Sequence, residues 1–92
     1  MDCLQFLVSG KVQGVGFRAY VRDQAQSLYI QGWVRNRADG TVEVCACGRE
    51  SALAAFGAAL SVGPKGARVA RVDRARVDRA SFSGFVIRYD GP

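Results

Sequence analysis

The fold is decided by residues 4–28, which read LQFLVSGKVQGVGFRAYVRDQAQSL. Large apolar residues recur at every second position from Leu4 to Val8, and this period predicts a strand with one buried face. The glycines between Gly10 and Gly16 then predict a loop. From Phe17 to Leu28 the apolar residues recur every three or four positions, so a helix is expected directly after the loop.

Two further strands and a second helix are expected in the middle of the chain. Residues 30–36 and 41–47 read as strands separated by the turn RADG, whose Asp-Gly pair is typical of a tight hairpin. These two strands should therefore pair antiparallel. Apolar residues at helical spacing predict a helix over residues 50–61, which a glycine and a proline stop shortly afterwards.

The last third of the chain completes the topology. The arginine-rich residues 67–79 are interpreted as a solvated edge strand, and the alternation over residues 85–89 predicts a final strand. The order is βαββαβ, with room for an additional strand. Such a chain most simply forms an α+β fold, the ferredoxin-like two-layer sandwich, with two helices on one face of a mainly antiparallel sheet. Its 92 residues suffice for one core, so a single domain over residues 1–92 is expected.

Composition narrows the classes of function. Thirteen basic and eight acidic residues give a net charge of +5, which favours an anionic partner. The chain contains no histidine, which excludes Ser-His and Cys-His relays and removes the commonest zinc ligand. No apolar run approaches the roughly 20 residues of a bilayer span, so a cytoplasmic protein without a membrane partner is expected. Reduced thiols are expected too, because Cys45 and Cys47 are poorly placed to bridge each other.

The segment GKVQGVGFR, residues 10–18, is the first candidate site. Its glycines allow several backbone N–H groups to point at one place, and the first turn of the helix adds free donors and partial positive charge. The spacing matches neither the nucleotide P-loop nor the dinucleotide fingerprint, so a smaller phosphate is favoured. Arg18 stands in that first turn, where a guanidinium can donate two parallel hydrogen bonds to phosphate oxygens. A solvated surface arginine is the ordinary alternative.

Asn36, at the end of the strand over residues 30–36, is the second candidate. An asparagine before a turn most often bonds its own backbone, and the segment alone does not decide between that alternative and a functional role. The topology favours a functional role, because the loop after the first strand and the end of the second can lie at the same edge of the sandwich. The Asn36 amide would then face a phosphate held by Arg18.

These segments resemble the acylphosphatase family. GKVQGVGFR and GWVRN followed by DGTVEV, within residues 10–18 and 32–44, look like the two characteristic segments of that family, and the similarity extends to SGFVIRY near the C-terminus. The resemblance implies a hydrolase that cleaves the carboxylic-phosphoric anhydride bond of small acyl phosphates, with no cofactor and no metal. It also implies that Asn36 orients the attacking water while Arg18 and the loop amides bind the phosphate. The loop residues concerned are Gln13, Gly14, Val15, Gly16, Phe17 and Arg18. We expect a monomer that binds inorganic phosphate or another small anion in the loop, and no nucleic acid.

Other readings stay open. Cysteines at positions 45 and 47 and the arginine-heavy residues 74–79 depart from the family pattern as we expect it. An RNA-recognition module shares the order of elements, but residues 41–47 lack the aromatic side chains that stack bases. A carbamoyl-phosphate-handling domain that acts with a partner, similar to the module in hydrogenase-maturation carbamoyltransferases, is a second alternative. A small-ligand regulatory domain is the third, although it would not need both Arg18 and Asn36.

Overall fold

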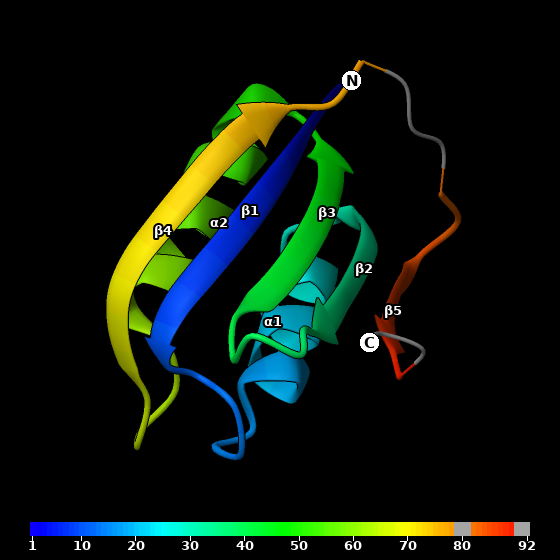
Figure 1. The fold of residues 1–92 in the computed structure, drawn as a ribbon. Coiled ribbons are helices and arrows are strands. Elements are labelled where there is room, and N and C mark those ends of the chain that lie inside the picture. The colour runs from blue at the N-terminus through cyan, green and yellow to red at the C-terminus, as the bar shows by residue number, and fades with distance from the viewer. Residues whose placement is uncertain (79–81, 90–92) are drawn as a thin grey trace.

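The computed structural model describes residues 1–78 and 82–89, which form five strands and two helices (Figure 1). In chain order the elements are β1 (Asp2–Lys11), α1 (Phe17–Ser27), β2 (Gln31–Asn36), β3 (Val42–Gly48), α2 (Glu50–Val62), β4 (Arg68–Arg76) and β5 (Phe85–Arg88). Every element predicted from the sequence is present. The predicted edge strand extended to residue 79, which lies outside the described residues. Neither helix of the described part of the chain is long and apolar enough to cross a membrane.

The strands form one sheet in the order β4-β1-β3-β2-β5. The pairs β4-β1, β1-β3 and β3-β2 are antiparallel, and β5 runs parallel to β2. Both helices lie on the same face of this sheet (Figure 1). The ferredoxin-like sandwich with a mainly antiparallel sheet is therefore confirmed, and β5 is the additional strand.

The core fills the space between the sheet and the helices. Phe56 of α2 packs edge to face against Phe6 of β1 and Phe85 of β5, with ring centroids 5.6 and 6.2 Å apart. Val21 and Ala25 of α1 are fully buried in the same core. Burial of each large apolar side chain contributes about 1.5–3 kcal/mol to stability. The loop between β1 and α1 thus begins and ends on elements that the core holds in place.

Gly32 allows β2 to lie close against β3. Its φ is +144°, and a Cβ atom there would lie 1.8 Å from the carbonyl oxygen of Cys45. A residue with a side chain would therefore both strain the backbone and collide with the neighbouring strand. This close approach fixes the path of β2 and so the position of Asn36 at its end.

The cysteines differ from the sequence-based expectation. The antiparallel register of β1 and β3 places Cys3 directly opposite Cys47, and the two form a disulfide. Reduced thiols were therefore the wrong expectation for this pair, because it lies across two strands rather than within one. Cys45 is a buried free thiol. Burial raises the pKa of this thiol, and the charge of Glu43 raises it further.

β4 forms one edge of the sheet, as the sequence predicted for most of residues 67–79. Its arginines are all exposed: Arg68, Arg71, Arg74 and Arg76. Arg71 donates a hydrogen bond to Asp73 over 2.8 Å, and the guanidinium of Arg74 lies 5.4 Å from the ring centroid of Phe6. The strand therefore forms a charged edge of the sheet, and its Arg74 side chain also covers part of the core.

Candidate active site

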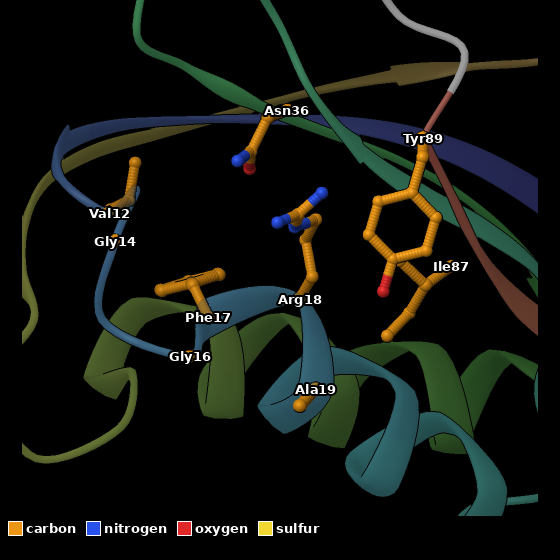
Figure 2. Close-up of a pocket in the computed structure, with 9 residues that line it drawn as sticks. All are labelled: Val12, Gly14, Gly16, Phe17, Arg18, Ala19, Asn36, Ile87 and Tyr89. Atoms are coloured by element: carbon orange, nitrogen blue, oxygen red, sulfur yellow. The ribbon is translucent and has the colours of Figure 1, made fainter.

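A cavity of about 160 Å³ opens at the edge of the sandwich, beside the loop that joins β1 to α1 and beside the end of β2. Figure 2 shows its lining residues: Val12, Gly14, Gly16, Phe17, Arg18, Ala19, Asn36, Ile87 and Tyr89. The cavity therefore combines the β1-α1 loop, the end of β2 and the C-terminal strand. The two candidate segments, far apart in the sequence, meet here as the topology predicted.

The β1-α1 loop is shaped by two glycines with left-handed backbone conformations. Gly14 has a φ of +74° and Gly16 a φ of +75°, and a Cβ atom at either position would touch nothing within 4 Å. Conformation rather than space therefore calls for glycine at both positions. The buried side chains of Val12 and Phe17 anchor the two ends of the loop.

The first turn of α1 keeps its donors available. Gly16 precedes the helix, no side chain of the described residues caps it, and its first turn contains no acidic residue. The early N–H groups of a helix have no partner within the helix, and the helix dipole adds partial positive charge there. An anion in the cavity would satisfy these groups.

Arg18 is the second residue of α1 and projects into the cavity (Figure 2). Its guanidinium carbon lies 4.8 Å from the ring centroid of Tyr89, a distance typical of a cation-π contact. Other arginines near the site are engaged elsewhere. Arg35 donates a hydrogen bond to the buried Glu43 over 2.8 Å, and Arg37 lies 3.8 Å from Asp39. Arg18 is therefore the cation that faces the cavity among its described lining residues.

Asn36 is the last residue of β2 and lies opposite Val42 of β3. Its side chain and that of Arg18 point toward one another across the cavity (Figure 2). The Asn36 Oδ1 atom is buried and has no hydrogen-bond partner among the described residues. The ordinary alternative, an asparagine whose oxygen bonds its own backbone, is therefore not what the structure contains.

The turn after Asn36 is held by its own hydrogen bonds. The Oδ1 atom of Asp39 accepts from the Thr41 amide over 3.0 Å and from the Thr41 hydroxyl over 2.6 Å. The two Thr41 donors, followed by the charge of Arg37, lower the pKa of the Asp39 carboxyl below its usual value. A turn closed by hydrogen bonds therefore follows the end of β2.

The structure does not place every residue of the candidate loop in the same way. Gly14, Gly16, Phe17 and Arg18 line the cavity. The side chain of Gln13 instead reaches the β2-β3 turn, and Val15 packs against the core. Sequence analysis predicted the loop as a whole and did not separate these orientations.

Ile87 and Tyr89 also line the cavity, and the sequence analysis did not propose them for the site. The alternation over residues 85–89 puts Ile87 of β5 and Tyr89, which directly follows β5, on the same side of the chain as Phe85, which is buried in the core. That alternation was visible in the sequence. The parallel pairing of β5 with β2, which places this side next to Arg18, was not visible in the sequence.

The chain is similar to proteins of known family. A family model described as "Acylphosphatase" matches residues 4–87. The "Acylphosphatase" of Pseudomonas paraeruginosa is 45% identical over 86 residues, which are 94% of each chain. The crystal structure of acylphosphatase from Bacillus subtilis has a TM-score of 0.94 at 37% identity and covers 97% of this chain and 100% of that one. A full-length HypF, in the phosphate- and nucleotide-bound form, has a TM-score of 0.84 at 29% identity, but the match spans only 12% of its length.

Proposed function

This chain belongs to the acylphosphatase family and is an acylphosphatase, and we propose that Arg18 and Asn36 divide the work of its active site. Arg18 and the backbone amides of residues 13–18 hold the phosphate group. Asn36 orients the water that attacks it. The substrate is a small acyl phosphate, which the enzyme converts to a carboxylate and inorganic phosphate.

The observation that carries this proposal is the unpaired oxygen of Asn36. A buried acceptor without a hydrogen bond costs about 1–3 kcal/mol, so proteins rarely keep one that no ligand or water satisfies. The Oδ1 atom of Asn36 is in this state and lies on the wall of a cavity that Arg18 faces. A water that donates to this oxygen would stand beside an anion held by the guanidinium.

The phosphate subsite is built from donors of different kinds. The guanidinium of Arg18 offers two parallel N–H groups, and hydrogen bonds of this charge-assisted type contribute about 1.5–3 kcal/mol each. The loop amides and the uncapped first turn of α1 add main-chain donors and the positive end of the helix dipole. Together they would stabilise charge on the phosphoryl oxygens during the transfer.

The reaction needs little more than this positioning. The water oxygen forms a bond to phosphorus while the bond from phosphorus to the acyl oxygen breaks, and the electron pair of that bond leaves with the carboxylate. A carboxylate is a good leaving group, so no strong acid is required. The proton of the water passes to a phosphoryl oxygen of the substrate. No covalent enzyme intermediate is expected, because the described lining residues offer no nucleophile paired with a base.

Two alanine variants test the division of roles. Release of phosphate from benzoyl phosphate is followed in the presence of a chelator, and inhibition by inorganic phosphate measures binding. Arg18→Ala should abolish both binding and turnover. Asn36→Ala should keep phosphate inhibition close to wild type and lower kcat by about 10²–10³, the range for loss of one well-aimed polar group.

The matched control is Arg22→Ala, which removes a half-buried arginine of the same helix that contacts Asp23. This variant should keep wild-type kinetics. The proposal is wrong if Asn36→Ala turns over normally, or if it loses phosphate inhibition as completely as Arg18→Ala does.

We further propose that the enzyme acts as a monomer and without nucleic acid. The cavity is lined by residues of one chain, so no second copy is needed to complete it. β3, a central strand of the sheet, carries no aromatic side chain for base stacking. Light scattering after size exclusion tests the first statement, and a filter-binding titration with single-stranded RNA at physiological salt tests the second.

A further inference from the structure

Gln13 is the one polar residue in the β1-α1 loop sequence VQGVG, residues 12–16. Its side-chain nitrogen, Nε2, donates one hydrogen bond to the carbonyl oxygen of Arg37 over 2.8 Å and another to that of Thr41 over 2.9 Å. A carboxamide nitrogen carries two hydrogens, so both of its donors are used. The loop is therefore tied to the β2-β3 turn by a single side chain.

The two acceptors lie next to the residues that place Asn36. Arg37 follows Asn36 directly, and Thr41 precedes Val42, the cross-strand partner of Asn36. The amide of Arg37 also donates to the Thr41 carbonyl over 2.9 Å, which closes the turn. Gln13 thus binds the turn directly beside Asn36, the residue at the end of β2 that lines the cavity.

The loop needs such a tie. Gly14 and Gly16 are exposed and have the backbone freedom of glycine, and the buried side chains of Val12 and Phe17 fix only its ends. The phosphate would be bound by this loop, whereas the water would be bound by Asn36 on a different strand. In-line attack requires these two parts to keep a constant separation, and a displacement of about 1 Å can cost about 10²-fold in rate.

We propose that the side chain of Gln13 is a positioning residue that holds the phosphate-binding loop in register with Asn36. This inference rests on the proposed roles of Arg18 and Asn36. It assigns Gln13 a function through its side chain, in addition to the backbone amide that the loop contributes. Because Gln13 acts on alignment, its loss should lower kcat more than phosphate affinity.

The test replaces Gln13 with methionine, which has a similar volume and no donors. Gln13→Met should lower kcat by about 10- to 100-fold and should change inhibition by inorganic phosphate less than threefold. The control, Gln26→Met, makes the same chemical change at an exposed position of α1 and should leave both quantities unchanged. Gln13→Asn, whose amide is one methylene too short to reach both carbonyl groups, should repeat the loss of kcat and replaces the methionine variant if that protein does not fold.

A double-mutant cycle separates positioning from a general loss of structure. Once Asn36→Ala has removed the group that aims the water, misalignment of the loop has little left to disturb, so adding Gln13→Met should lower kcat less than threefold further. Additive losses in the cycle overturn the inference, as does wild-type kcat in a folded Gln13 variant. Either result leaves the single variants Arg18→Ala and Asn36→Ala to judge the proposed function on their own.

Discussion

Reduction of the Cys3–Cys47 disulfide should destabilise the protein strongly and leave its active site intact. The two cysteines are 44 residues apart in the sequence. In the chain-entropy treatment, a cross-link that closes a loop of this length disfavours the unfolded chain by about 4 kcal/mol. For a domain of this size, each kcal/mol lost from the free energy of unfolding lowers the melting temperature by about 5 °C, so the melting temperature should fall by about 20 °C.

The site should be spared because of where the disulfide lies. Cys3 is near the start of β1, whereas the phosphate loop follows the end of that strand. Eight residues of extended chain from Cys3 to Lys11 span about 26 Å at about 3.3 Å per residue. The reduced enzyme should therefore keep the wild-type kcat and phosphate inhibition at 25 °C, well below its lowered melting temperature.

The assay compares thermal unfolding by circular dichroism and turnover of benzoyl phosphate, each with and without dithiothreitol. Cys3→Ser should show the low melting temperature under both conditions. Cys45→Ala, which removes the buried free thiol, should keep the response to dithiothreitol. A shift below about 5 °C on full reduction would refute the stabilising role, and parallel loss of kcat in folded, reduced enzyme would refute the separation of disulfide and site. The reduced form is the relevant one if the enzyme works in the cytoplasm, where disulfides are rare.

Two further predictions concern residues around the cavity. Tyr89→Leu should weaken inhibition by inorganic phosphate about two- to fivefold, the range for an exposed cation-π contact, because the ring no longer holds Arg18. Tyr89→Phe keeps the aromatic ring and should keep wild-type inhibition. Equal effects of the two variants would contradict the ring contact. The pKa of Asp39 is lowered by the Thr41 donors, so its contribution to stability is complete above the ordinary carboxyl pKa and is lost as the pH falls through the lowered value. Asp39→Asn should therefore flatten the acid side of the melting temperature against pH, and an unchanged profile would show that the turn does not act through this charge.

Much of the fold could be predicted from the sequence because local pattern and global topology agree. The change of period at Phe17 marked the passage from loop to helix, and the Asp-Gly pair marked the hairpin. The meeting of Arg18 and Asn36 followed from the order of the elements, since that order puts the β1-α1 loop and the end of β2 at one edge.

What the sequence could not reveal depends on pairing between distant strands. The disulfide requires the register that sets Cys3 against Cys47, and spacing along one strand gave no hint of it. The contact of Tyr89 with Arg18 requires β5 to lie parallel to β2. The orientation of the Gln13 side chain depends on the conformation of the glycine loop, and an irregular loop produces no periodic pattern in the sequence.

The arginines of β4 also affect the association of one copy of the chain with another. An edge strand of nine residues exposes unpaired backbone groups on which a second copy could add its own strand. If two copies aligned along β4, their arginine rows would be brought together, and mutual repulsion would push them apart. We therefore expect this arginine row to disfavour edge-to-edge aggregation, and added salt to weaken the effect because it screens the repulsion.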